Sequence, residues 1–249
     1  MARASGDAAE ADGRTRLKVA AIADVHLGRD EGVVWRDVFA EASREAGVLV
    51  LAGDLTDLGT PEQAHILAKS LRGCTVPVVA VLGNHDHESG QAEQVGEIIR
   101  GVGVHLLDGQ SCEVGGVAFV GVKGFVGGFG NRMLGSFGEP IVKQFVAETV
   151  NEALRLENAM RRVRNDRVVV VLHYAPVADT VAGEPPEIMP FLGCSRLAET
   201  IDRFTVSAVV HGHAHHGRYE GRTPAGQPVY NVAAAIPKPT GRPYALLEV

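Results

Sequence analysis

Five short apolar runs recur along the chain, and each has the pattern of a strand that is covered on both faces. The runs consist mainly of Val, Leu, Ile and Ala, without the regular polar positions of a half-exposed strand. Segments between them carry apolar residues at helical spacing instead. Strands that alternate with helices predict an α/β fold. The predicted strands are Leu17–Ala23, Val48–Ala52, Val76–Leu82, Val168–Leu172 and Val206–Val210.

Three of the intervening segments are predicted to be helices. The first covers Gly32–Ala46, where apolar residues repeat every three or four positions. The second begins at Thr60-Pro-Glu-Gln63, which resembles a capping box with Pro at the first helical position, and ends at Gly73. The third is a long amphipathic helix over Pro140–Arg164. We expect its apolar face to consist of Ile141, Phe145, Val146, Val150, Leu154 and Met160.

Two segments break this alternation and predict hairpins. Residues 102–122 have the pattern of a meander, with tight turns at Asp108-Gly109 and Gly115-Gly116. Residues 217–249 contain strand-like pieces around Thr223–Gly226 and a last one over Tyr244–Val249. Hairpins beside a parallel core indicate mixed sheets, and two stacked sheets would accommodate them.

The length of 249 residues fits either one large domain or two small ones. The sequence has no internal repeat and no long linker, which predicts a single domain over residues 17–249. Residues 1–16 are rich in Ala, Gly, Asp and Arg and have no apolar stretch. They are predicted to be a solvated, disordered tail rather than a secretory signal.

Net charge, hydropathy and cysteine content limit the partners and the location that are expected for the protein. The 30 acidic residues exceed the 24 basic ones, for a net charge of −6, which disfavours nucleic acid as a partner. No apolar run approaches the ~18 residues needed to span a bilayer. Cys74, Cys112 and Cys194 are far apart and form no CxxC pair, which favours a cytoplasmic location.

Each of the five predicted strands is followed by carboxylate, amide or imidazole side chains. In α/β sheets, the carboxyl ends of strands are where ligand sites form. Taken singly, each piece is also explained by an ordinary turn or a buried histidine. Five such pieces in order are instead the composition of a metal site. The pieces are Asp24-Val25-His26, Gly53-Asp54 with Asp57, Gly83-Asn84-His85-Asp86, His173, and His211-Gly212-His213-Ala214-His215.

Together these pieces resemble the motif set DxH … GDxxD … GNH(D/E) … H … GHxH of the calcineurin-like metallophosphoesterases. The resemblance spans residues 24–215, and no element of the set is missing. It implies a four-layer sandwich, in which two mixed β-sheets are flanked by helices and two metal ions lie at the strand ends. By this resemblance, Asp24, His26 and His215 hold one metal, Asn84, His173 and His213 hold the other, and Asp54 bridges them.

The same resemblance implies hydrolysis of a phosphate ester by a hydroxide that bridges the metals. Donors of nitrogen and oxygen without thiolate suit Mn, Fe or Zn, as two divalent ions or a mixed-valence pair. In similar enzymes, the histidine at the position of His85 protonates the leaving oxygen or stabilises the transition state. Asp86 could orient His85, and Asp57 could steer the ligands, but both residue types also cap turns.

The expected substrate is a small phosphate ester, because one domain without a basic surface suits a small molecule better than a polymer. A phosphodiesterase is favoured over a phosphomonoesterase, and both over a nuclease. The alternative to an enzyme is a non-catalytic, metal-binding scaffold. Scaffolds of this superfamily usually lack metal ligands or the GNH histidine, and both are present here. The chain contains no GxxxxGK(S/T) motif of a P-loop protein.

The segment Gly121–Gly138 contains seven glycines among its eighteen residues, with Phe125, Phe129 and Phe137 between them. Such a glycine content opposes a regular helix or strand. One interpretation is a loop held to the core by its phenylalanines. The other is a mobile flap beside the metals, in which Lys123 or Arg132 would meet a phosphate oxygen.

Overall fold

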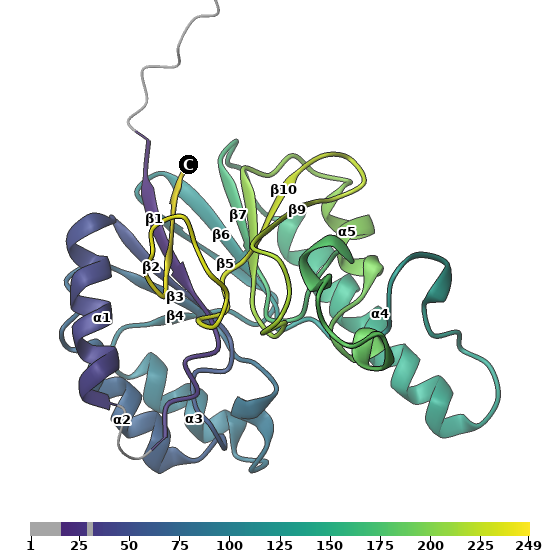
Figure 1. Ribbon diagram of the computed structural model, residues 1–249, viewed down its shortest axis with the longest axis horizontal. Helices are drawn as coiled ribbons and strands as arrows, with labels where there is room; N and C mark the ends of the chain where they lie inside the picture. Colours follow the sequence, from purple (N-terminus) through teal and green to yellow (C-terminus); the bar gives the residue numbers. More distant parts are fainter. Residues whose placement is uncertain (1–15, 29–31) are drawn as a thin grey trace, which may run out of the picture.

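Two β-sheets packed face to face form the centre of the molecule (Figure 1), in a computed structural model that describes residues 16–28 and 32–249. The predicted tail, apart from Arg16, lies outside the described residues. The first sheet has the order β11-β1-β2-β3-β4, with β1 Lys18–Ile22, β2 Val48–Ala52, β3 Val78–Val81, β4 His105–Leu106 and β11 Ala245–Glu248. The second has the order β5-β6-β7-β8-β10-β9, with β5 Gln110–Val114, β6 Val117–Gly121, β7 Val168–Val171, β8 Ala208–His211, β9 Glu220–Arg222 and β10 Pro228–Asn231.

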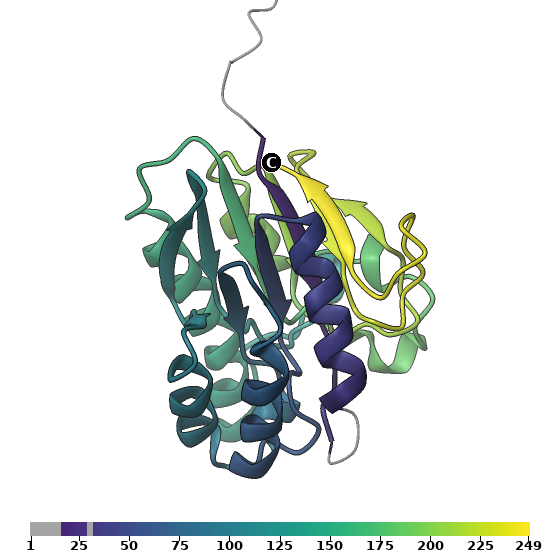
Figure 2. The same ribbon diagram turned by 90° about the vertical axis from the view of Figure 1, so that its left-hand side faces the viewer.

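Both sheets are mixed, as the sequence predicts. In the first sheet β1 to β4 run parallel and β11 pairs antiparallel with β1. In the second sheet β6, β7, β8 and β10 run parallel, while β5 and β9 pair antiparallel at the two edges. Helices cover the outer face of each sheet and complete the four layers (Figures 1 and 2). The helices are α1 Gly32–Glu45, α2 Pro61–Leu71 and α3 Ala92–Arg100 on the first sheet, with α4 Pro140–Met160 and α5 Ser195–Ile201 on the second.

The central strands β2, β3 and β7 are apolar throughout because they are buried on both faces, and β1 follows the same pattern after Lys18. In β1, Val19 and Ala21 face the core between the two sheets, whereas Ala20 and Ile22 face the core under α1 to α3. All four of these side chains have no exposed surface. The missing polar alternation in the sequence is therefore a direct consequence of the layered packing.

The segment 102–122 differs from the predicted meander. Its first strand, β4, belongs to the first sheet, where it pairs parallel with β3. The chain then turns at Gly109, whose φ is 79°, and enters the second sheet as β5. Only β5 and β6 form the expected hairpin, which turns at Gly115-Gly116. The Asp108-Gly109 turn thus joins two sheets, because β3 offers a free edge that a short strand can extend.

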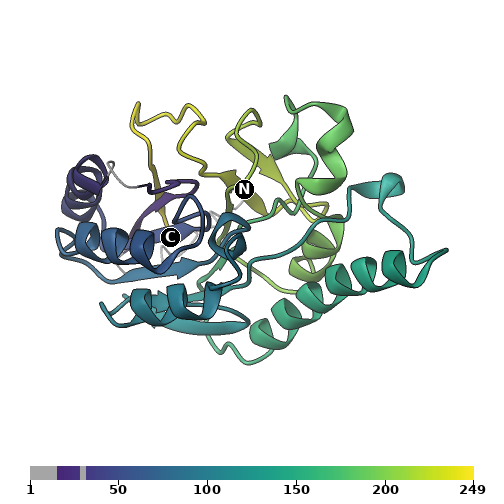
Figure 3. The same ribbon diagram turned by 90° about the horizontal axis from the view of Figure 1, so that it is seen from below.

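The apolar face of α4 also differs from the prediction. The helix ends at Met160 rather than at Arg164. Ile141 is 70% exposed and Leu154 is 49% exposed, so neither belongs to the buried face. The first turns of α4 project beyond the second sheet, where no other element among the described residues covers them (Figure 3). The buried face repeats at alternating steps of three and four residues, over Val146, Thr149, Ala153, Leu156 and Met160.

Candidate metal centre

The polar residues that follow five strands meet at one edge of the two sheets. Asp24 follows β1, Asp54 follows β2 and Asn84 follows β3, and these strands are parallel neighbours in the first sheet. His173 and His213 follow β7 and β8, which are parallel neighbours in the second. Since the carboxyl ends of parallel strands lie at the same edge, residues distant in sequence become neighbours there.

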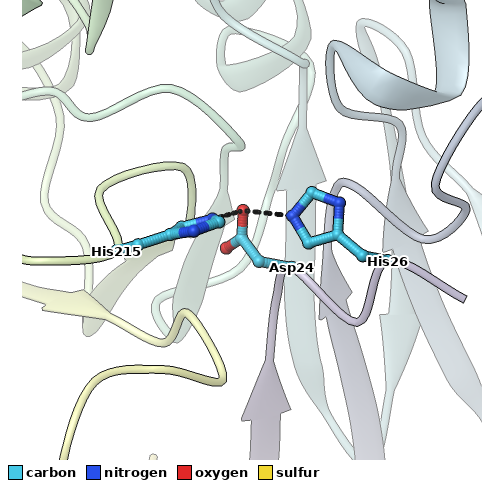
Figure 4. Close-up of side chains that lie close together, drawn as sticks. All are labelled: Asp24, His26 and His215. Atoms are coloured by element: carbon cyan, nitrogen blue, oxygen red, sulfur yellow. Dashed lines mark hydrogen bonds and ion pairs between the residues drawn. The ribbon is translucent and has the colours of Figure 1, made fainter.

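Asp24, His26 and His215 form the first group of candidate metal ligands, with one donor atom each within 4.8 Å of the others. Both imidazoles point toward the Asp24 carboxylate (Figure 4), at 3.1 Å for His215 Nε2 and 4.0 Å for His26 Nε2. His26 Nε2 is buried and has no hydrogen-bond partner among the described residues. A buried nitrogen without a partner is costly, and a cation beside Asp24 would provide one.

Asp54, His173 and His213 form a second group with the same spacing. His173 Nδ1 donates to the Ala52 carbonyl at 3.0 Å. Its Nε2 therefore faces the site, 2.9 Å from Asn84 Oδ1 and 3.3 Å from Asp54 Oδ1. A neutral ring held in this orientation presents a lone pair to two oxygen donors, which is the arrangement a cation requires.

The charges of Asp54 and His173 depend on each other. Burial opposes ionisation of both groups, but their mutual attraction outweighs it. The pKa of Asp54 is lowered far below its usual range, and the pKa of His173 is raised to about 9. A cation at this site would replace the His173 proton, because an imidazole that ligates a metal is neutral.

His213 is oriented by contacts at two of its atoms. Its backbone amide donates to the Asp24 carboxylate at 3.0 Å, and its Nε2 donates to the Phe191 carbonyl at 3.1 Å. Burial, together with the nearby charge of His173, lowers the pKa of His213 to about 4. The neutral ring thus keeps Nδ1 unprotonated, with its lone pair available to a cation shared with Asp54 and His173.

Asp54 lies between the two groups. Its Oδ1 is 3.3 Å from His173 Nε2 and accepts the backbone amide of His85 at 2.9 Å. Its Oδ2 is 3.8 Å from His26 Nε2. The two oxygens of one buried carboxylate therefore face a histidine of each group.

The backbone at the site is strained. The four non-glycine residues of the described chain with positive φ are Asp24 at 57°, His26 at 40°, Asp54 at 49° and His213 at 69°. Such conformations cost on the order of 1–3 kcal/mol each and persist where the surroundings impose them. All four coincide with ligand positions implied by the resemblance.

Two motif glycines allow strand ends to approach closely. A Cβ at Gly83 would collide with the Asp54 carboxylate and backbone amide, and a Cβ at Gly212 would collide with the Asp24 carboxylate. The glycines of the GNH and GHxH motifs are therefore required by the packing of the neighbouring carboxylates.

His85 lies at the open side of this centre. One of its nitrogens is within 4.8 Å of donors from His26 and Asp54, and its ring centroid is 4.4 Å from that of His26. Its Nδ1 donates to the Asp57 carbonyl at 2.7 Å. The Asp57 carboxylate is 4.0 Å away, so this residue acts on His85 through its backbone rather than its side chain.

Asp86 does not orient His85 through its side chain. Its fully buried carboxylate accepts the backbone amides of Leu55, Thr56 and Gly83 and the hydroxyl of Thr56. These contacts join the loop after β2 to the loop after β3. Asp86 thereby fixes the spacing between Asp54 and the GNH motif.

Sequence reasoning did not identify the contacts that backbone carbonyls and an adjacent aromatic ring make with the candidate ligands. The carbonyls of Ala52 and Phe191 fix His173 and His213, but any residue type supplies a carbonyl. The ring of Tyr174 packs at 4.5 Å from that of His213. The sequence signal that could have identified Tyr174 is its position directly after His173. His211 is buried and bonds Thr180 Oγ1 at 2.8 Å, outside the candidate ligand groups.

Residues 124–130 of the Gly/Phe segment are held by hydrogen bonds. The amide of Gly124 donates to Glu152, the amides of Gly127 and Gly128 donate to the carbonyls of Pro190 and Gly193, and Thr149 Oγ1 donates to the Val126 carbonyl. Phe129 packs against a small core that includes Ala175 and Ala214, whereas Phe137 is 88% exposed. This part of the segment has the contacts of a pinned loop, and backbone groups hold it more than phenylalanines do.

Comparison with known proteins identifies a matching family, one relative and two similar structures. The chain matches the model of the family described as calcineurin-like phosphoesterase over residues 17–217. A probable cyclic nucleotide phosphodiesterase of Fibrobacter succinogenes is 32% identical over 80 residues, which cover 28% of this chain and 31% of that protein. The aligned stretch is thus under a third of that relative's length.

Two crystal structures of Thermus thermophilus proteins share the fold. One has a TM-score of 0.53 at 12% identity and covers 88% of this chain and 90% of its own. The other, of a hypothetical protein, has a TM-score of 0.51 at 17% identity and covers 88% and 77%. The family match, the layered fold and the convergence of the motif residues agree, and this chain belongs to the calcineurin-like phosphoesterase family.

Proposed function

We propose that the protein is a phosphodiesterase that hydrolyses a small phosphate ester with the help of two divalent metal ions. The observation that carries this proposal is the position of Asp54, whose two oxygens face His26 and His173 from different ligand groups. In the proposed centre, Asp54 would contribute to the binding of both ions. Asp24, His26 and His215 would hold one ion, and Asn84, His173 and His213 would hold the other.

The donor set fits such ions. It consists of imidazole nitrogens and carboxylate and amide oxygens without a thiolate, which favours Mn, Fe or Zn over a soft metal. The buried, unpartnered His26 Nε2 supports the same assignment. When bound, the two ions would supply an activated water and stabilise negative charge on the phosphoryl oxygens.

His85 has the position expected of a general acid. The Asp57 carbonyl can only accept a hydrogen bond, so His85 Nδ1 carries a proton in either charge state. The proton that exchanges is therefore the one on Nε2. In the proposed reaction, Nε2–H donates to the alkoxide oxygen as the ester bond breaks.

A phosphomonoesterase of the same fold is the second candidate. The diester is favoured by the similarity to the probable cyclic nucleotide phosphodiesterase of F. succinogenes. A binding scaffold is disfavoured because the complete ligand set and His85 are present. None of the helices in the described residues is long and apolar enough to cross a membrane. We also propose a cytoplasmic location, on the basis of the cysteine pattern.

The test measures metal content and hydrolysis together. The wild type, loaded with Mn, Fe or Zn, should hydrolyse bis-p-nitrophenyl phosphate faster than p-nitrophenyl phosphate. Asp54→Asn should lose bound metal and activity in parallel, because an amide cannot balance two dications. Asp166→Asn, at an exposed position, is the matched control and should retain both. Elemental analysis showing two metals and normal turnover in Asp54→Asn would refute the assignment.

A further inference from the structure

A buried asparagine outside the family motifs lies behind the first group of candidate ligands. Asn231 is the last residue of β10 and has no exposed surface. An amide side chain in such a position is costly unless its donor and acceptor groups are bonded. The partners of this amide therefore show which parts of the backbone it holds in place.

The Asn231 side chain joins the loop after β10 to the loop that carries His215. Its Oδ1 accepts the backbone amide of Ala233 at 3.1 Å, which closes a turn within its own loop. Its Nδ2 donates to the Ala214 carbonyl at 2.7 Å, 17 residues earlier in the chain, and to the Thr180 carbonyl at 3.4 Å. One amide group thus forms both a local turn and a link between loops.

The loop after β10 is in turn attached to the residue before Asp24. Ala23 donates its backbone amide to the Val232 carbonyl at 3.0 Å, and its carbonyl accepts the amide of Ala234 at 2.9 Å. These two bonds lie on either side of the residue whose amide Asn231 binds. The turn that Asn231 closes is therefore the part of the loop that contacts the end of β1.

Asn231 is consequently connected to the backbone on both sides of one ligand contact. Ala23 precedes Asp24, and Ala214 precedes His215. His215 Nε2 lies 3.1 Å from Asp24 Oδ1, and the two side chains point toward each other (Figure 4). Movement of either loop alone would change the separation of these two donor atoms.

The second group of candidate ligands depends less on this link. The ring of His213 is held separately, by the Phe191 carbonyl at 3.1 Å and by packing against the Tyr174 ring at 4.5 Å. The His215 side chain is 40% exposed and has no hydrogen bond to a backbone carbonyl within the described residues. A shift of the Ala214 carbonyl should therefore displace His215 more than His213.

We propose that Asn231 is a positioning residue of the metal centre. It sets the separation of Asp24 and His215, and thereby the affinity of the first ligand group for its ion. The inference rests on the proposed function, because it takes two ions to bind. It adds a residue outside the motif set and makes the two ions unequal in their dependence on that residue.

Asn165 provides a matched control, because it makes the same two kinds of bond at the opposite end of β7 from His173. Its Oδ1 accepts the amide of Arg167 at 2.9 Å, and its Nδ2 donates to the Gly116 carbonyl at 3.2 Å. A serine hydroxyl can still close such a local turn, but it is too short to reach the distant carbonyl. Asn→Ser therefore removes a comparable link at each of the two positions.

Equilibrium dialysis of the metal-free protein against increasing Mn²⁺ tests the inference without turnover. The wild type should bind two ions. Asn231→Ser should weaken one of them about 10-fold or more, the usual effect of losing a group that orients a metal ligand, and change the other less than about 3-fold. Asn165→Ser should leave both affinities unchanged.

A double variant identifies which ion depends on Asn231. His215→Ala should weaken the first ion by itself. Addition of Asn231→Ser to His215→Ala should then change the affinity of the remaining ion less than about 3-fold, because the ligand through which Asn231 acts is already absent. A further loss of 10-fold or more in the double variant would assign Asn231 to the second ligand group and overturn the inference.

Melting temperatures of the metal-free variants separate positioning from a general loss of stability. A residue that only stabilises the fold would weaken both ions to the same extent, and that result overturns the inference, as does wild-type affinity for both. If Asn231→Ser does not fold, Asn231→Asp keeps the size and the turn oxygen but cannot donate to Ala214 when ionised, and the same inequality is measured in it. A wild type that binds fewer than two Mn²⁺ ions contradicts the proposed function and the inference together, whereas equal weakening contradicts the inference alone.

Discussion

The carboxylate of Asp86 accepts hydrogen bonds from both the hydroxyl and the backbone amide of Thr56, at 2.7 and 2.8 Å. Its second oxygen accepts the amides of Gly83 and Leu55 at 2.8 and 3.1 Å. One side chain therefore connects the backbone next to Asp54 with the backbone next to Asn84. The carboxylate of Asp86 contacts neither the Asp54 nor the Asn84 side chain. It nevertheless fixes the distance between these two candidate ligands.

Asp86→Asn should destabilise the fold and weaken metal binding together. The NH₂ of the new side chain would face N–H or O–H groups that now donate to a carboxylate oxygen of Asp86. Each group left without a partner costs about 1–3 kcal/mol. Chemical denaturation and elemental analysis measure the two effects, with Asp166→Asn as the control. A variant of wild-type stability and full metal content would show that the two loops keep their spacing without this carboxylate.

His85→Ala should separate catalysis from metal binding. We expect metal content to stay near that of the wild type while kcat falls ~10²–10⁴-fold, the usual range for a general acid. The loss should be smaller for a p-nitrophenyl ester than for an alkyl ester, since p-nitrophenolate leaves without a proton. Similar losses for both leaving groups would contradict the proposed proton transfer from Nε2.

Phe129 and Phe137 provide a matched pair within the Gly/Phe segment. Phe129→Ala removes a ring packed on the small core beside Ala175 and Ala214, and it should cost about 1–3 kcal/mol, less than a fully buried Phe. Phe137→Ala, at an 88% exposed position, should stay within about 0.5 kcal/mol of the wild type. Melting temperatures measure both. An unchanged melting temperature with altered substrate preference in Phe129→Ala would favour the mobile flap.

Metal removal should lower the melting temperature reversibly. An ion that binds only the folded state adds about 2.7 kcal/mol at 100 times its dissociation constant. Chelation should therefore shift the transition downward, and addition of Mn²⁺ should restore it in the wild type. In Asp54→Asn the restoring shift should be much smaller. A melting temperature that is independent of Mn²⁺ in the wild type would argue against a metal centre.

The convergence of the candidate ligands could be predicted from sequence because strand ends and motif residues coincide. Asp24, Asp54 and His173 each follow a continuous apolar run, and parallel strands bring such ends together. The buried face of α4 could not be predicted in the same way. Ile141 and Leu154 have the hydropathy of core residues, but exposure depends on which elements lie opposite them. That information comes from tertiary packing.

The assignment of β4 was wrong for a related reason. His105–Leu106 is too short to carry a pattern of its own, and α3 separates it from its partner β3. The contacts that orient the imidazoles were equally invisible, because the carbonyls of Ala52, Asp57 and Phe191 carry no sequence signature. Sequence thus identifies side chains that converge at the candidate metal centre, whereas the backbone groups that orient them become visible only in three dimensions.

The pairing of β1 with β11 has a consequence for how the protein acquires its shape. Lys18 lies opposite Glu248, and β1 also carries Asp24 at its carboxyl end. While a ribosome is still making the chain, one flank of β1 has no strand to pair with until β11 has emerged. Pairings between such distant segments also slow folding. An apolar strand edge that stays open during synthesis invites association with other chains, so this edge is where we expect a nascent or truncated molecule to need protection.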